Sequence, residues 1–146
     1  MKFLCDQHRA VVSQCIHKAK RSWQHTLLSA RNYADKQNWQ MALIYSGNSF
    51  EIAEIILLSQ PCEQNIERYL QTSIEFAHAL RNCHSRSNAL ALYDLVFSQL
   101  NNLDCNIDIN TKMQPLKDVL FEPIDSVNLW MSKWHHLIGA KPEQLH

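Results

Sequence analysis

Glycine and proline are scarce in this sequence. Its 146 residues include two glycines and four prolines. The first proline is Pro61, so sequence compatible with helix runs almost unbroken over residues 1–60. A β-sandwich or β-barrel needs many turns built from these two residue types, and their scarcity argues against both folds.

Long apolar runs are also missing. The longest are short runs such as residues 55–58, whereas a membrane span requires roughly 20 residues. The apolar residues at the start of the chain are followed at once by Asp6, Gln7 and His8, which is not the pattern of a secretory signal. We therefore expect no membrane partner and no secretory signal.

The cysteines offer no disulfide framework. There are five, which is an odd number, and no pair has the C-x-x-C spacing: Cys5, Cys15, Cys62, Cys83 and Cys105. Such a pattern is typical of proteins from a reducing compartment, so we expect a cytoplasmic protein. Most of these cysteines are expected to act as small buried hydrophobic residues.

No catalytic, phosphate-binding or metal motif stands out. Soft metal ligands gather near the start of the chain, at Cys5, His8, Cys15 and His17, but they do not spell out a closed site of four ligands. His135 and His136 are consecutive and so diverge around a helix. We expect no metal, no cofactor and no enzymatic activity.

Apolar residues recur at helical spacing along the whole chain. The clearest case is residues 38–61, where steps of three and four residues join Trp39, Ala42, Leu43, Ser46, Phe50, Ala53, Ile56 and Leu57. This pattern predicts a helix buried on one side, with both flanking segments packed against it. Trp39 is expected to be a core residue that the first two helices share.

The same spacing predicts an all-α fold of about six antiparallel helices, arranged as an αα-hairpin stack or an irregular bundle. Residues 6–35 are expected to form one helix or two nearly collinear ones. The others are expected near residues 39–60, 63–82, 89–103, 111–122 and 125–139. We expect a single domain over residues 1–140 and a tail over residues 141–146.

Three local features refine this outline. Asp35 or Asn38 can cap the helix that starts at Trp39, because a short side chain accepts from its unpaired amides. Thr111 can cap the fifth helix, with Pro115 in its first turn. Gly47 costs its helix about 1 kcal/mol relative to alanine. Either a close neighbour compensates for that cost or the helix tolerates it.

Two sets of small and aromatic residues resemble tetratricopeptide repeats, in which a small residue lets two helices approach closely. The first set is Ala30, Tyr33, Trp39 and Ala42, and the second is Ala77, Leu80, Ala89 and Tyr93. The sets lie 47 residues apart, from Ala30 to Ala77, whereas that family has a period of about 34. The resemblance covers residues 26–97. It implies a non-enzymatic protein that holds a peptide or partner helix in a concave groove.

Charge is unevenly distributed although the formal net charge is zero. Residues 1–36 hold seven Lys and Arg against two Asp, a net of +5, so the remainder carries −5. The candidate partner-binding residues form a basic patch on the first long helix: His17, Lys18, Lys20, Arg21 and His25. They could pair internally with acidic residues of the next two helices, at Glu51, Glu54, Glu63, Glu67 and Glu75.

We favour internal pairing of this basic patch over a role in binding. The leading function is a cytoplasmic protein–protein interaction module or adaptor, whose partner is another protein or a peptide. The alternative is a helical regulator that binds nucleic acid or a phosphate-bearing ligand through the basic helix. Nucleic acid is the weaker choice, because a pI of about 7.1 lacks the positive excess of a dedicated binder.

The cysteine and histidine pattern gives a first testable prediction. Purified protein should carry no stoichiometric zinc and should keep its helicity in excess chelator, because no segment supplies four ligands at metal-binding spacing. Elemental analysis and far-ultraviolet circular dichroism measure the two properties. One tightly held equivalent of metal would contradict the prediction.

Overall fold

The chain is all-α, as predicted. The computed structural model describes the backbone of residues 3–139 and the side chains of residues 3–134, and this part contains seven helices and no strand. They are α1 (Asp6–Gln14), α2 (Ile16–Asp35), α3 (Trp39–Ser59), α4 (Glu63–Asn82), α5 (Arg86–Asn101), α6 (Ile109–Phe121) and α7 (Ile124–Gly139).

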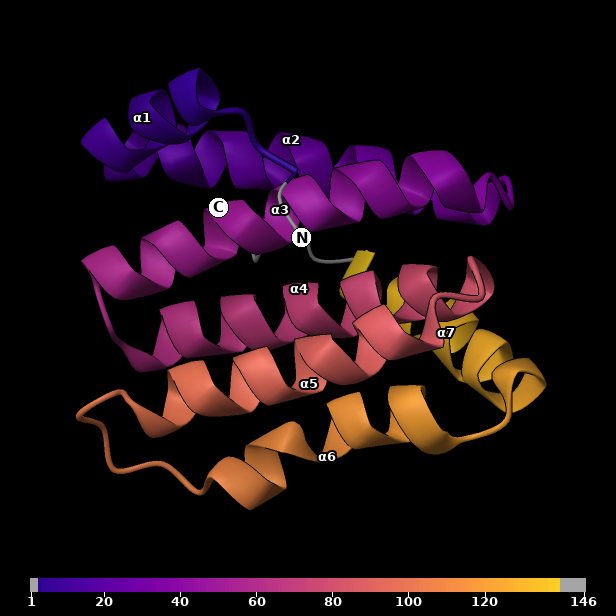
Figure 1. Cartoon of the computed structure of the whole chain (residues 1–146). Helices are drawn as coiled ribbons and strands as arrows, with labels where there is room; N and C mark the ends of the chain where they lie inside the picture. The colour runs from indigo at the N-terminus through magenta and orange to yellow at the C-terminus, as the bar shows by residue number, and fades with distance from the viewer. Residues whose placement is uncertain (1–2, 140–146) are drawn as a thin grey trace.

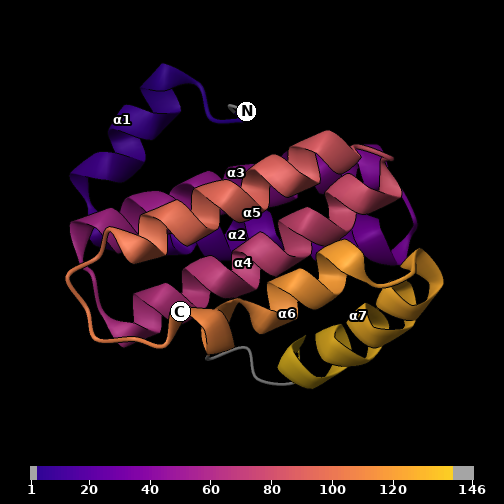
Figure 2. The same cartoon turned by 60° about the horizontal axis from the view of Figure 1, so that its bottom comes forward.

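Helices that follow one another in the sequence mostly lie side by side in the structure. Helices α2 to α6 are stacked one after another with neighbours antiparallel, and α7 lies against the end of α4 (Figure 1). Figure 2 shows α1 set apart from α6 and α7, on the opposite side of the stack. Short connections force this antiparallel arrangement, because a turn of a few residues can only return the chain beside the helix it has left.

Helix α4 occupies the centre of the stack. It packs against α3, α5, α6 and α7, and every residue from Thr72 to Leu80 is buried. Helix α3 is buried on two sides, between α2 and α4, rather than on the single side that its apolar stripe predicted. The second buried side was missed because it carries small and polar residues, notably Gly47, Ser49 and Glu51.

The first helix of the prediction is broken at Cys15, whose backbone is extended at φ −146° and ψ 116°. Helices α1 and α2 are therefore not collinear, which corrects the expectation of one continuous or nearly straight segment. The chain ahead of α1 instead returns to the middle of α3, where Phe3 and Leu4 meet Glu51. Hydrophobic periodicity continues through Cys15 because both helices pack on the same core.

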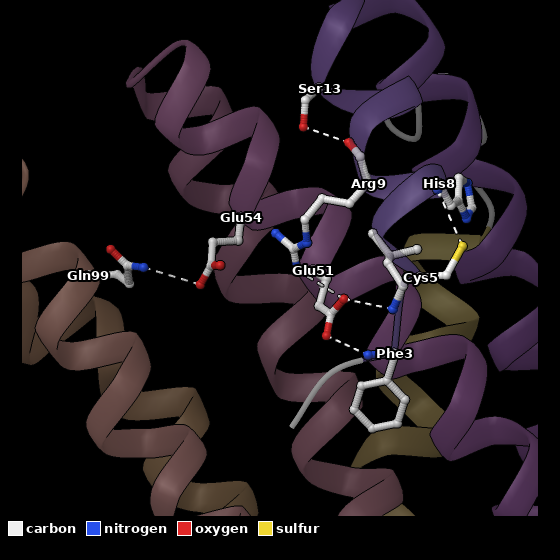
Figure 3. A network of polar contacts seen from close by, with 9 residues as sticks. Phe3, Cys5, His8, Arg9, Ser13, Glu51, Glu54 and Gln99 are labelled. Carbon is white, nitrogen blue, oxygen red and sulfur yellow. Dashed lines mark hydrogen bonds and ion pairs between the residues drawn. The ribbon is translucent and has the colours of Figure 1, made fainter.

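The carboxylate of Glu51 anchors this returning segment (Figure 3). It accepts hydrogen bonds from the backbone N–H of Phe3 at 2.6 Å and of Leu4 at 2.8 Å, and from Arg9 Nη2 at 3.1 Å. The Phe3 ring lies over Gly47 and packs edge-on against Phe76, with ring centroids 5.4 Å apart. A bulky neighbour therefore explains the glycine inside α3.

Helix capping is as predicted at α3 and different at α6. The Asn38 side chain accepts from the Met41 N–H, which confirms Asn38 as the N-cap of α3. At α6 the cap is Asp108, whose carboxylate accepts from the N–H and the hydroxyl of Thr111. The helix thus begins earlier than predicted, and Pro115 lies inside it rather than in its first turn.

Trp39 is not the shared core aromatic that its spacing suggested. It lies half-buried at the first position of α3, with its ring edge-on to His78 at 5.0 Å. The core aromatic that α2 supplies is instead Trp23, which is 1% exposed and donates from Nε1 to Thr72 Oγ1 at 2.9 Å. A residue on the apolar stripe is less buried at the end of a helix than in its middle, because fewer neighbouring side chains cover it there.

The contact at Gly47 predicts that Gly47→Ala destabilises the protein. A Cβ there would lie 2.5 Å from Phe3 ring carbons, so the ring must leave its place. The lost burial of a phenylalanine costs about 1.5–3 kcal/mol, which outweighs the gain of about 1 kcal/mol from replacing a helical glycine. Urea melts measure the net loss.

The same substitution in a Phe3→Ala background is the matched control. Without the ring, alanine at position 47 should raise the free energy of unfolding, so the effect should change sign. An equal loss in both backgrounds would show that Phe3 does not occupy this place in solution.

Candidate functional site

The five predicted binding residues lie together on α2. His17, Lys18, Arg21 and His25 are exposed and face away from the buried stripe of the helix, whereas Lys20 is half-buried and lies on the side of Leu27 and Arg31. At 100° per residue the five positions cover less than half of the circumference. We call them the basic face.

A shallow depression marks this face. It has a volume of about 350 Å³ and is lined by His17, Lys20, Arg21 and Gln24. No acidic side chain lines it. Among the side chains that the structure describes, no carboxylate pairs with Lys18, Lys20 or Arg21. The internal pairing that we favoured from the sequence is therefore wrong for these three cations.

Internal pairing does occur for two other cations of the same segment. Arg31 Nε lies 2.7 Å from Glu75 Oε1 and its Nη2 lies 3.1 Å from Oε2, with both side chains buried. Arg9 pairs with Glu51 at 3.1 Å. Each arginine lies on an inward face of its helix, and a buried carboxylate requires such a partner.

The remaining acidic candidates have other surroundings. Glu67 pairs with Lys112 of α6 rather than with α2. Glu54 accepts from Gln99 Nε2 of α5 at 3.2 Å (Figure 3). Burial raises the pKa of Glu54, although Gln99 and Arg9 oppose the shift. The sequence identified acidic residues able to pair, but it could not show which helix each one faces.

The five cysteines are free thiols in the described structure. Cys15 lies at the N-cap of α2, where the backbone N–H groups of Lys18 and His17 lower its thiol pKa. Burial raises the thiol pKa of Cys83. Within residues 3–134, no three His, Cys, Asp or Glu side chains are grouped as metal ligands.

A second depression, which the sequence did not indicate, lies where α2, α3, α4 and α7 meet. It has a volume of about 430 Å³ and is lined mainly by polar residues: Ala34, Asp35, Gln37, Trp39, His78, Asn82, Asn128 and Ser132. The residues come from segments up to 98 positions apart, from Ala34 to Ser132. Polar residues inside predicted core helices, such as His78 and Asn82, were the available signal.

Helix α3 is long and apolar enough to cross a membrane by length and composition alone. A window of 18 residues within this helix has a mean hydropathy of 1.3, and 56% of that window is buried inside the protein. Packing between α2 and α4 accounts for that apolarity, because a helix covered on two sides reads as hydrophobic nearly all round.

No family model, curated protein or solved structure matches the chain. The tetratricopeptide resemblance is therefore supported only as far as the antiparallel helical architecture.

The surroundings of Glu54 generate a prediction about pH. Its folded-state pKa is raised, so the folded protein binds this proton more tightly and loses stability as the pH rises through that pKa. Glu54→Gln should therefore raise the urea midpoint at pH 7 and change it less near pH 4. Asp104→Asn, in an exposed connection, is the control. A lower midpoint at pH 7 would contradict the prediction.

Proposed function

We propose that this protein is a non-enzymatic interaction module that binds an acidic protein or peptide through the basic face of α2. The observation that supports the proposal most is the division of the cations in residues 1–36. Arg9 and Arg31 are paired with buried carboxylates, whereas Lys18 and Arg21 are exposed, Lys20 is half-buried, and none of these three has a carboxylate partner among the described side chains. Exposed unpaired cations attract acidic partners and speed their association.

The position of the basic face along α2 supports a role beyond helix stability. Lys18 lies in the first turn of the helix, and Lys20 and Arg21 follow directly. Cations stabilise a helix at its C-terminus, where the dipole is negative, and they are unfavourable at the N-terminus. The first turn of α2 has no acidic residue and the last turn no basic one. This arrangement of charges destabilises the helix. Binding of an acidic partner by these cations would explain why they are placed there.

The size of the face indicates the kind of partner. From His17 to His25 the helix rises about 12 Å at 1.5 Å per residue. A helix with carboxylates at positions i, i+4 and i+7, or an extended acidic peptide of about four residues, matches this length. The depression lined by His17, Lys20, Arg21 and Gln24 can seat one carboxylate between charged donors.

The tetratricopeptide-like matches favour the same class of function, because that family binds peptides and partner helices. The basic face lies just ahead of residues 26–97, which carry the matches. The free state of the five thiols supports a cytoplasmic location.

A phosphate-bearing ligand or nucleic acid is the second candidate. Lys18, Lys20 and Arg21 also suit phosphate oxygens, and the depression lined in part by Lys20 and Arg21 can hold a phosphate group. The neutral total charge argues against general nucleic acid binding. A protein that binds a nucleic acid backbone contacts many phosphates at once and needs more cations than this face provides.

The test is a combined charge reversal, Lys18→Glu, Lys20→Glu and Arg21→Glu. Because these side chains lack internal partners, the melting temperature should stay close to that of the parent. Binding to poly-glutamate, measured by calorimetry at low salt, should be lost together with its salt dependence. A variant with Arg86→Glu, Lys117→Glu and Lys133→Glu changes the net charge equally and should retain binding.

Each alternative has its own outcome. A clear loss of stability in the α2 variant would favour the alternative in which these cations pair with acidic residues of the protein itself. If both variants bind poly-glutamate equally weakly, the loss of binding is due to the change in net charge and not to the basic face. Tighter binding of a phosphorylated peptide or an oligonucleotide than of poly-glutamate, lost only in the α2 variant, would favour the second candidate.

A further inference from the structure

The depression at the other end of α2 has the features of a binding site for a small molecule. Its volume of about 430 Å³ falls in the usual range for such sites, about 300–1,000 Å³. It lies where α2 ends, α3 begins, α4 ends and α7 passes, at the right of Figure 1. Side chains from four helices therefore converge on one space.

Hydrogen bonds between helices hold the polar wall of this depression in place. His78, which is 5% exposed, has Nε2 2.6 Å from Asn128 Oδ1. Asn82 Nδ2 donates to the same oxygen at 3.1 Å and to the His78 backbone carbonyl at 2.9 Å. These bonds use one oxygen of Asn128 for two donors. They leave the Asn128 amide N–H groups and the Asn82 side-chain oxygen available to a ligand.

The described lining of the depression carries one negative charge. Asp35 is the one charged residue among the described lining residues, and its exposed carboxylate forms no ion pair with a described side chain, although Lys36 follows it directly in the sequence. It is the last residue of α2, where the helix dipole adds partial negative charge. Of the neighbouring arginines, Arg31 is paired with the Glu75 carboxylate. The Asp35 carboxylate is therefore the group in the described lining that can attract a charged ligand, and it attracts a cation.

An aromatic surface lies beside the carboxylate. Trp39 is half-buried, and its ring is held edge-on against His78 at an interplanar angle of 77°. Tryptophan is the aromatic side chain that attracts organic cations most strongly.

We propose that this depression binds a small organic ammonium compound. The ammonium group lies between the Asp35 carboxylate and the Trp39 ring, and a hydroxyl or carbonyl on the ligand meets the Asn128 amide and the Ser132 hydroxyl. The site is separate from the basic face, and the proposal does not rest on the proposed function.

Choline, butylammonium and the neutral choline isostere 3,3-dimethyl-1-butanol are the probes. Titrations of the full chain are followed by ¹H–¹⁵N spectra of the tryptophan indoles, with Trp39 assigned through Trp39→Phe. Trp39 should shift with the ammonium compounds, while the buried Trp23 should not. The isostere should bind about tenfold more weakly or not at all, because it matches choline in shape and lacks the charge.

Asp35→Asn is the main variant and Asp94→Asn, exposed on α5, is its control. The exposed position of Asp35 lets the fold survive the change, and ammonium binding should weaken by about tenfold or more. Asp94→Asn should bind as the parent does. The proposal is overturned if no ammonium compound shifts Trp39, if the isostere binds as well as choline, or if both variants bind equally.

Discussion

The burial of α4 is the constraint on which the rest of the structure depends. A helix covered on nearly all sides holds its polar side chains away from water, which favours partners for them on neighbouring helices. Glu75 meets Arg31 of α2, and His78 meets Asn128 of α7. Removing one member of a buried charged pair costs about 3–5 kcal/mol, so a shift of α2 along α4 would carry a penalty of that order. Apolar contacts hold the stack together, and these polar contacts fix its register.

Helix α2 carries opposite charges at its two ends, and both oppose its own dipole. Lys18, Lys20 and Arg21 lie near the positive end, and Asp35 lies at the negative end. An isolated helix of this composition would gain from the reverse order. Tertiary packing offsets the cost, because the buried stripe of α2, rather than its exposed charges, determines its stability. The basic face and the depression beside Asp35 are thereby left as separate surfaces, which we propose bind acidic partners and organic cations respectively.

The sequence predicted the fold class and most helix boundaries, because apolar spacing and proline positions are local signals. It predicted α4 at Glu63–Asn82 and the Asn38 cap as they are found. It missed the break at Cys15, since the same core faces both helices and the periodicity does not change. It also placed the basic face in internal ion pairs, because pairing depends on which side of a helix meets which neighbour. The depression beside Trp39 could not be predicted from the sequence for the same reason, because only the packing of the helices brings its residues together.

The attachment of Phe3 and Leu4 to Glu51 bears on the order of folding during synthesis. Helices α2 and α3 are neighbours in sequence and can form their hairpin as soon as both have left the ribosome. Phe3 and Leu4 are made before both of these helices, yet their anchor, Glu51, lies 48 and 47 residues later. Closing so long a loop carries an entropic cost that only the finished surface of α3 repays. The earliest residues of the described chain are therefore among those that reach their native contacts late, and until then the space above Gly47 stays open.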